Sequence, residues 1–202
     1  MILHPPPTGR LFFSSDHHFN HKNVIAYCDR PFKSVFVMDI EMIIRWNELV
    51  QPEDTVIYLG DFSLSTGPLA EIAPNLHGRK ILIPGNHDQC HPWGGKQKMA
   101  RHFQKYLVAG FELLNPDDEH YLNLGDGQMV RLSHFPYREQ EPGEHGQKHA
   151  EHRPVDNGSW LFHGHVHQHW LKRGRMINVG VDVHDFRPVA LEHLVALMKE
   201  DT

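Results

Sequence analysis

The sequence predicts an α/β fold, and two patterns along the chain lead to that prediction. In the first half, short apolar runs alternate with segments in which apolar residues recur at helical spacing, an order typical of a sheet with parallel strands. In the second half, short strands follow one another across Gly-containing turns, which indicates antiparallel pairing. We therefore expect both kinds of strand pair in one molecule.

The first half of the chain supplies the strand–helix alternation. Strands are expected over residues 11–15, 55–59 and 80–83, which are rich in aliphatic and aromatic residues. Residues 37–49 carry apolar residues at roughly helical spacing and are predicted to form an amphipathic helix, which a Gln-Pro pair ends. Residues 68–73 are predicted to form a second helix, so the order is strand, helix, strand, helix, strand.

Two other segments of the first half are expected to lack helices and strands. Residues 1–10 contain three consecutive prolines and are predicted to form an extended lead-in. Residues 19–31 are rich in polar groups and are predicted to form a loop that lines the site.

The second half is expected to contain mostly short strands. In order, we predict a helix over 99–107, strands over 111–114, 120–124 and 129–133, a hairpin over 170–178 and a terminal helix over 191–199. The long polar stretch 137–158 is predicted to be either a solvated loop or a lid that faces the substrate.

The composition indicates one globular domain. At 202 residues, without an internal repeat or a linker, residues 1–202 are expected to fold together. The net charge of −5 gives no overall basic character of the kind that nucleic-acid-binding proteins show. Cys28 and Cys90 are expected to be reduced thiols. Because no apolar stretch resembles a signal peptide or a membrane span, a cytoplasmic location without membrane contact is expected.

Five apolar segments each end in residues that can bind a metal ion. These ends are Asp16-His17-His18, Gly60-Asp61, Gly85-Asn86-His87-Asp88, His134 and His163-Gly164-His165. A single polar turn after a strand is ordinary, but chance would scatter such residues along the chain. The repetition therefore favours a common site at the C-terminal ends of the strands.

In this order, the motifs Asp-x-His, Gly-Asp, Gly-Asn-His-Asp, a lone His and Gly-His-x-His resemble the calcineurin-like metallophosphoesterase superfamily. The resemblance extends from Asp16 to about Gly180, and residues 15–32 resemble its small bacterial and phage branch. It implies a single metallophosphoesterase domain over residues 1–202. It also implies a four-layer α/β/β/α sandwich of two mixed sheets.

The predicted metal ligands are nitrogen and oxygen donors: Asp16, His18, Asp61, Asn86, His134, His163 and His165. Seven such donors are too many for one ion of ordinary geometry and suit two divalent ions. Mn²⁺ is the expected metal, with Fe²⁺, Zn²⁺, Co²⁺ and Ni²⁺ as alternatives.

The family pattern implies a division of these ligands. Asp61 would bridge two ions roughly 3.5–4 Å apart. One ion would take Asp16, His18 and His165. The other ion would take Asn86, His134 and His163.

The resemblance implies hydrolysis of phosphoric esters by a hydroxide that bridges the two ions, with phosphodiesters of nucleotide or nucleic-acid type as the leading substrate class. His87 is predicted to face the substrate as general acid and phosphate binder, with Asp88 fixing its tautomer. Asn20, His21 and Arg30 are predicted phosphate contacts, with ordinary loop or surface polarity as the alternative.

Two further histidines are expected to lie outside the ligand set. His17 alternates with two ligands on an extended segment, so its side chain should point away from them. His167 continues the alternation after His165 and is predicted to lie on the surface or behind the ligands.

Other functions share parts of this pattern. Phosphomonoesterase or protein phosphatase activity would use the same metal core, and a nuclease would act on single-stranded nucleic acid. A non-catalytic scaffold of the same fold would bind proteins instead. The presence of His87 beside a complete ligand set favours the enzyme, with a phosphoester as its partner.

Overall fold

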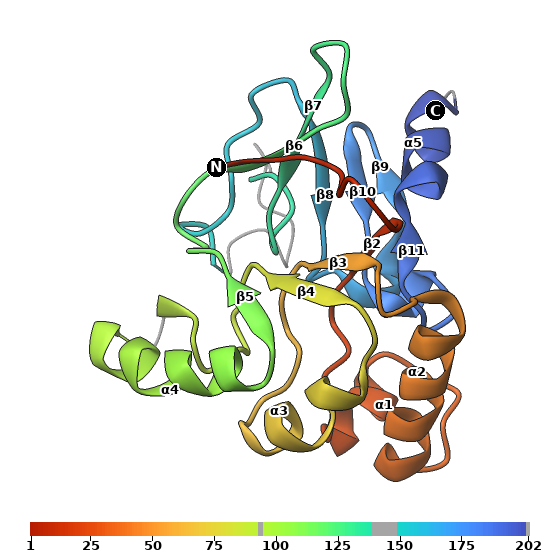
Figure 1. The fold of residues 1–202 in the computed structure, drawn as a ribbon, viewed down its shortest axis with the longest axis vertical. Helices are drawn as coiled ribbons and strands as arrows, with labels where there is room; N and C mark the ends of the chain where they lie inside the picture. Colours follow the sequence, from red (N-terminus) through yellow and green to blue (C-terminus); the bar gives the residue numbers. More distant parts are fainter. Residues whose placement is uncertain (93–94, 139–148, 201–202) are drawn as a thin grey trace.

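Two β-sheets packed face to face form the centre of the molecule (Figure 1). The computed structural model describes residues 1–92, 95–138 and 149–200. The five-stranded sheet has the strand order β11-β2-β3-β4-β5, and the six-stranded sheet has the order β1-β6-β7-β8-β10-β9. Both sheets contain parallel and antiparallel pairs. The expected α/β fold with two mixed sheets is therefore confirmed, whereas the specific four-layer arrangement stays a prediction.

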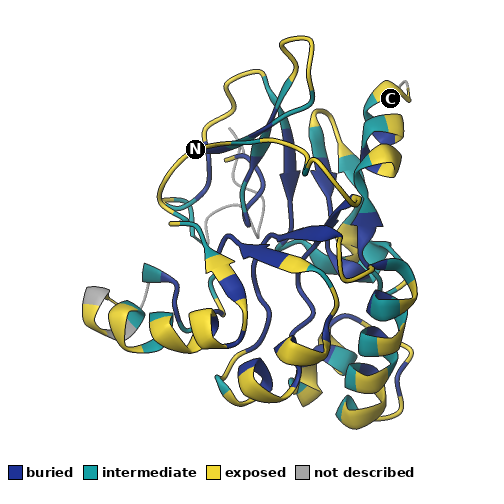
Figure 2. Cartoon of the chain, in the orientation of Figure 1, coloured by how far each residue is buried: buried dark blue, intermediate teal, exposed yellow. Residues whose placement is uncertain are grey.

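The five-stranded sheet is built around parallel strands. Its members are β2 (Leu11–Ser14), β3 (Thr55–Tyr58), β4 (Arg79–Leu82), β5 (Phe111–Leu113) and the antiparallel edge strand β11 (Val189–Ala190). All residues of β2 and β3 are buried (Figure 2). Strands buried on both faces read as continuous apolar runs, which is why the sequence located them well.

Four helices cover one face of this sheet (Figure 1). They are α1 (Lys22–Tyr27), α2 (Val35–Leu49), α3 (Gly67–Glu71) with the 3₁₀ turn η1 (Ala73–Asn75), and α4 (Lys96–Val108). Met38, Met42 and Trp46 recur every four residues on α2 and are fully buried in the core shared with the sheet. The helix begins two residues earlier than predicted because Ser34 Oγ accepts the backbone N–H of Val37.

The second core lies between the two sheets. The six-stranded sheet consists of β1 (Ile2–Leu3), β6 (His120–Asn123), β7 (Met129–Leu132), β8 (Trp160–His163), β9 (Lys172–Arg173) and β10 (Met176–Asn178). Its Val130 and Phe162 pack with Phe13 and Ile57 of the other sheet. The terminal helix α5 (Leu191–Lys199) has the predicted bounds and packs against the same core. The 3₁₀ turns η3 (His167–His169) and η4 (Val181–Val183) complete this half.

Three predicted segments differ from the structure. Residues 2–3 of the extended lead-in form β1, because backbone hydrogen bonds from Met1 and Tyr121 seat the chain end against β6. Residues 22–27 of the predicted loop form α1, a one-and-a-half-turn helix with only Val24 buried and no side-chain cap, so its sequence signal is weak. Residues 111–113 join the first sheet in parallel with β4 rather than the second-half strands.

The remaining predictions on the fold can be followed in part. The hairpins over 120–133 and 170–178 are confirmed as antiparallel pairs. Cys28 and Cys90 are both buried and free. Residues 139–148 of the long polar stretch lie outside the described residues, so neither the loop nor the lid prediction for 137–158 is decided. In the described part of the chain, no helix combines the length and apolar character that crossing a bilayer requires.

The buried face of α2 carries the first prediction. Trp46 is fully buried and its Nε1 donates to the His77 carbonyl at 3.0 Å. Trp46→Ala should lower the free energy of unfolding by about 3–5 kcal/mol, because it leaves a cavity and an unpaired carbonyl. Urea denaturation followed by circular dichroism measures this change.

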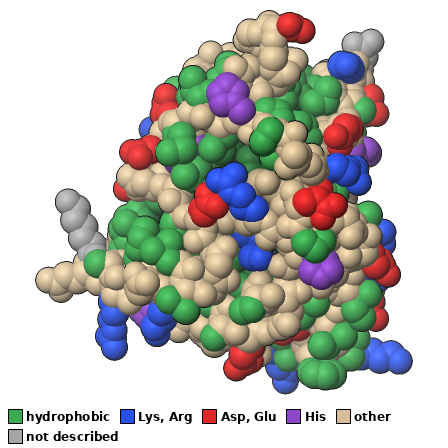
Figure 3. All heavy atoms as spheres, in the orientation of Figure 1, with side chains coloured by type: hydrophobic (Ala, Val, Ile, Leu, Met, Phe, Trp, Pro, Cys, Tyr) green, Lys and Arg blue, Asp and Glu red, His purple; other side chains and the backbone are tan. Residues whose placement is uncertain are grey.

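Phe36→Ala on the same helix is the matched control. Phe36 is 72% exposed, and Val37, Ile40 and Ile44 of the same helix are exposed as well. Figure 3 shows hydrophobic side chains on the surface at the position of α2. Removal of the Phe36 ring should change the free energy of unfolding by less than about 0.5 kcal/mol. Similar effects of the two substitutions would contradict the placement of Trp46 in the core.

Candidate metal centre

The predicted ligands lie where strands of both sheets end. Asp16 and His18 follow β2, Asp61 follows β3, and His134 follows β7. The loops after β2 and β3 are joined by backbone hydrogen bonds from Asp16 N to Gly60 O (3.0 Å) and from His18 N to Asp61 O (3.1 Å). The two loops therefore leave the sheet side by side and present their side chains to one site.

The backbone of these loops is unusual. Asp16, His18, Asp61, His165 and His167 all have positive φ values, between 48° and 70°. Such values are uncommon for residues other than glycine and tend to occur at functional sites. Here they turn each side chain out of the strand direction and toward the same point.

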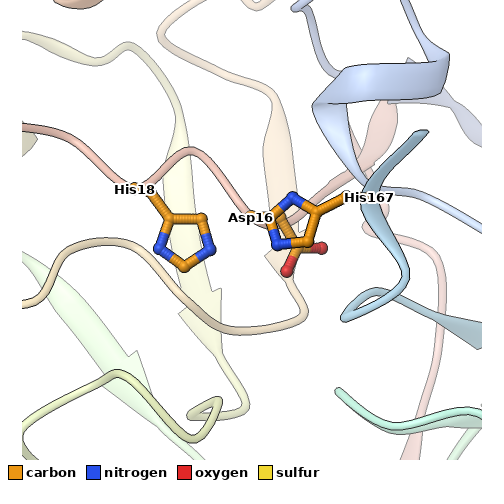
Figure 4. A group of neighbouring side chains, drawn as sticks. All are labelled: Asp16, His18 and His167. Carbon is orange, nitrogen blue, oxygen red and sulfur yellow. The ribbon is translucent and has the colours of Figure 1, made fainter. Parts of the chain in front are cut away.

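The first group of potential ligands contains Asp16, His18 and His167, which we call the His167 group (Figure 4). One ligand atom from each lies within 4.8 Å of the others. His167 Nδ1 lies 2.9 Å from Asp182 Oδ2, which leaves Nε2 for a metal ion. A carboxylate that holds the second ring nitrogen is typical of metal-binding histidines.

The surroundings of His167 favour its protonated form, so an ion bound at Nε2 would displace a proton from that nitrogen. Burial lowers the pKa of His167, but its hydrogen bonds to Asp182 and Cys28 outweigh burial and raise that pKa to about 11. By contrast, burial lowers the pKa of His18 well below its usual value. His18 is therefore a neutral imidazole at pH 7, which is the form that binds metals.

The second group contains Asp61, Asn86, His134 and His165, which we call the His134 group. His134 Nδ1 lies 2.7 Å from the Leu59 carbonyl. Because a carbonyl only accepts hydrogen bonds, Nδ1 carries the proton and the neutral ring has its lone pair on Nε2. This Nε2 faces two further acceptors, Asn86 Oδ1 at 3.1 Å and Asp61 Oδ2 at 3.5 Å. Three converging acceptors match the requirements of a cation.

Asp61 lies between the two groups. Its Oδ2 is 3.6 Å from His18 Nε2 and 3.5 Å from His134 Nε2. Two ligands bound to one ion at about 2.1 Å lie roughly 3–3.5 Å apart, so these distances fit a carboxylate shared by two ions. Burial raises the pKa of Asp61, and cations on both sides would stabilise its charged form.

A second observation supports a metal ion at this point. Among the described residues, both ring nitrogens of His18 are buried without a hydrogen-bond partner. A buried polar atom without a partner costs free energy. Coordination of an ion by one of these nitrogens would remove part of that cost.

The structure corrects the predicted pair His163 and His165. The side chain of His163 stays in β8, its ring packs on Trp170 with centroids 4.7 Å apart, and its Nδ1 bonds to the Gly164 carbonyl. His165 instead lies beside His134, with ring centroids 5.2 Å apart. The assignment therefore shifts by two residues, because the chain turns toward the site only after the strand ends at His163.

Two glycines permit the close approach of the loops. A Cβ atom at Gly164 would overlap Ser15 Oγ and Asp16 Oδ2, and one at Gly85 would overlap Asp61 Oδ1. The backbone of each glycine thus packs directly against a carboxylate of the site. Any larger residue would displace that carboxylate.

Arg30 is a positioning residue, which corrects its predicted role as a phosphate contact. It is buried, and its Nε and Nη2 donate to the two oxygens of Asp182 at 2.7 and 2.9 Å. Its Nη2 and Nη1 also donate to the carbonyls of Asp16 and His17. Arg30 therefore fixes the β2 loop, and through Asp182 it also fixes His167.

Asp88 is also a positioning residue, which corrects its predicted contact with the His87 ring. Its Oδ2 accepts the backbone N–H groups of Asp61 (2.8 Å) and Gly85 (2.9 Å), and its Oδ1 accepts that of Phe62 (3.0 Å). The carboxylate thus ties the loops after β3 and β4 together. His87 itself is anchored by its backbone N–H, which donates to Asp61 Oδ1.

The remaining predicted residues divide between the core and the rim of the site. His17 points away from the ligands as predicted, with its ring stacked on Phe19 and bonded to Tyr58 Oη. The His21 ring lies 5.7 Å from that of His18, at the rim. Asn20 is exposed, and its backbone N–H donates to the Asp39 carboxylate.

Sequence reasoning missed His167 and Asp182 as parts of the site. His167 was visible as the third histidine of the alternation, and a Gly-His-x-His register that starts at Gly164 would have included it. Asp182 carries no motif of its own. It comes to His167 because Asn178 forms a turn with Gly180 and also donates to the His167 carbonyl at 2.7 Å.

Comparisons with known proteins found relatives whose names state no activity. No family model matches the chain. It is similar to the uncharacterized protein MJ1445 of Methanocaldococcus jannaschii, with 30% identity over 95% of this chain and 92% of the relative. It is also similar to the gene 66 protein of Mycobacterium phage D29, with 34% identity over 90% of this chain and 92% of the relative.

A solved structure has a similar fold. The crystal structure of the protein of unknown function AQ665 from Aquifex aeolicus matches with a TM-score of 0.68 and 26% identity. The match covers 94% of this chain and all of that one. The similarity therefore extends over most of the fold.

The corrected ligand assignment makes a prediction about metal content. After loading with Mn²⁺ and removal of free metal, the unaltered protein should retain two ions and His167→Ala should retain about one. His163→Asn should keep both, because the Asn amide can still donate to the Gly164 carbonyl. Elemental analysis counts the ions, and circular dichroism checks that each variant is folded. Loss of an ion from His163→Asn, with His167→Ala unchanged, would restore the original assignment.

Proposed function

This chain belongs to the family of Methanocaldococcus jannaschii MJ1445 and the mycobacteriophage gene 66 proteins, and we propose that it is a metal-dependent phosphodiesterase. The observation that carries the proposal is the position of Asp61 between His18 and His134, with His87 beside them. The resemblance of the motifs to the calcineurin-like metallophosphoesterases supports the same proposal.

Two divalent ions, with Mn²⁺ expected, would be held by the His167 group and the His134 group with Asp61 shared. When bound, such ions lower the pKa of a water molecule and offset the negative charge of phosphate oxygens. The chain sets the position of the ions, because Arg30, Asp88, Gly85 and Gly164 hold the loops that carry the ligands.

His87 is assigned to the leaving group of the ester. Its side chain is exposed, and its ring centroid lies 5.2 Å from that of His18, so His87 lies next to the ligands. Burial and the neighbouring His134 lower its pKa, while the Asp88 carboxylate acts in the opposite direction. An anionic ester bound beside the ring would act in the same direction as Asp88 and raise this pKa. His87 would then give its proton to the departing oxygen.

The hydrogen bonds that occupy the Arg30 guanidinium favour a diester over a monoester as the substrate. A monoester carries two negative charges at neutral pH, whereas a diester carries one. Arg30 is fully engaged with Asp182 and two backbone carbonyls, so it does not supply a further cation to the substrate. A diester, with its single negative charge, needs less positive charge from the site than a monoester does.

The proposal is tested with purified protein, Mn²⁺, and two chromogenic esters. The protein should be inactive after chelation, regain activity with Mn²⁺, and prefer bis(p-nitrophenyl) phosphate to p-nitrophenyl phosphate. Asp61→Asn should lose both ions and with them the turnover of both esters, because it removes the shared charge. Asp126→Asn is the control, since Asp126 also has a positive φ but lies in the β6–β7 turn.

The outcomes separate the alternatives. Full activity after verified removal of metal would contradict a metal-dependent reaction. A strong preference for the monoester would identify a phosphomonoesterase. Tight binding of two ions without turnover of either ester would favour a scaffold.

A separate prediction concerns His87. His87→Ala should keep both ions while losing turnover on the order of 10²–10⁴-fold on an ester with an alkyl leaving group. A p-nitrophenyl ester should lose less, because its leaving group departs as a stabilised anion. Steady-state rates on both esters and the metal content are measured together. Equal losses on the two esters would make His87 a phosphate binder, and loss of metal would make it a ligand.

A further inference from the structure

Tyr27, the last residue of α1, is an exposed aromatic residue at the rim of the metal site. Its side chain is 72% exposed, although most large aromatic residues of the described chain are buried. Its ring contacts that of His21 in an edge-to-face arrangement, with centroids 6.3 Å apart. His21 in turn contacts His18 of the His167 group. Two ring contacts therefore connect Tyr27 to the metal ligands.

Two contacts hold Tyr27 in this position. One is made by its backbone carbonyl, and the other is made by the side chain of the next residue, Cys28. Gln168 Nε2 donates to the Tyr27 carbonyl, so the end of α1 is joined to η3, which begins at His167. The Cys28 thiol lies with His167 and Asp182 in one cluster of atoms within 4.8 Å of one another. Tyr27 is thus held beside η3, which carries the candidate ligand His167. Its exposed ring therefore belongs to the rim of the site.

We propose that Tyr27 is a stacking platform for a planar group of the substrate, which makes nucleotide-type diesters the preferred substrate class. This inference rests on the proposed phosphodiesterase function and narrows its substrate. A nucleobase is joined to its 5′-phosphate by one ribose, and only one side chain, that of His21, lies between the rings of Tyr27 and His18 in this series of contacts. With the phosphate at the ligands, the base would reach the exposed ring.

The chemistry of stacking fits the surroundings of Tyr27. Stacking on an aromatic ring is favourable for any of the nucleobases, since every base has a π-face. The net charge of the chain is −5, so attraction of a polyanion by the whole surface would contribute little. A single rim aromatic therefore suits one nucleoside better than a long strand of nucleic acid.

The test compares two diesters that share the p-nitrophenyl leaving group. One is thymidine 5′-(p-nitrophenyl phosphate), and the other is methyl p-nitrophenyl phosphate, which lacks the nucleoside. Tyr27→Ala should lower kcat/KM for the thymidine ester about 5- to 100-fold, the range that loss of one base stack gives. The methyl ester should be unaffected. Tyr27→Phe should behave as the unaltered protein, and Phe36→Ala controls for the loss of an equally exposed aromatic.

Binding supplies a readout that does not depend on turnover. Titration calorimetry with thymidine 5′-monophosphate and with methyl phosphate, on Mn²⁺-loaded protein, should show weaker binding by Tyr27→Ala for the nucleotide alone. Equal losses for both ligands, or no loss for either, would overturn the stacking role. Absence of turnover for both esters, with the nucleotide still bound through Tyr27, would contradict the phosphodiesterase proposal and leave the stacking role in place.

Discussion

The arrangement of the site depends on the buried carboxylate of Asp61. It faces imidazole nitrogens on two sides, and its backbone and Oδ1 are held by Asp88 and by the N–H of His87. A buried charge without a partner is costly, and hydrogen bonds from backbone groups offset only part of that cost. The loops around Asp61 therefore hold a geometry that divalent ions would stabilise, and this links the stability of the loops to the presence of metal.

A buried ion pair between Arg30 and Asp182 also holds the site in place. Arg30 and Asp182 form a bidentate ion pair whose side chains are almost fully buried. Its remaining bonds go to the carbonyls of the β2 loop on one side and to His167 on the other. Removing either partner would leave a buried charge unpaired, which is strongly destabilising. The pair thus fixes Asp16 and His167 relative to each other although they lie 151 positions apart in the sequence.

Much of the fold could be predicted from the sequence because most of its signals are local. Buried strands such as β2 and β3 read as apolar runs, and α5 was predicted to the residue because its apolar spacing is regular. The misses were short or non-local: β1 depends on pairing with β6, and α1 buries only Val24.

The site was harder to predict for a related reason. The alternation of histidines at 163, 165 and 167 is ambiguous until the end of β8 is known, because the positive φ values of His165 and His167 reverse the strand pattern. The roles of Arg30 and Asp88 were also invisible, since both act through backbone groups of distant loops. A sequence motif identifies residue types, whereas these roles depend on which donors the fold brings into reach.

The two halves of the site come from different sheets, so their spacing is a property of the core between the sheets. The five-stranded sheet supplies Asp16, His18 and Asp61, and the six-stranded sheet supplies His134, His165 and His167. Several hydrogen bonds cross from one sheet to the other at this point, among them those from His134 Nδ1 to Leu59 O, from Val181 N to Ser15 O and from His165 N to the Asp16 carboxylate. Leu59 packs directly in the core between the sheets. A change of volume in that core would therefore shift His134 relative to Asp61, and so alter the candidate metal centre without touching it.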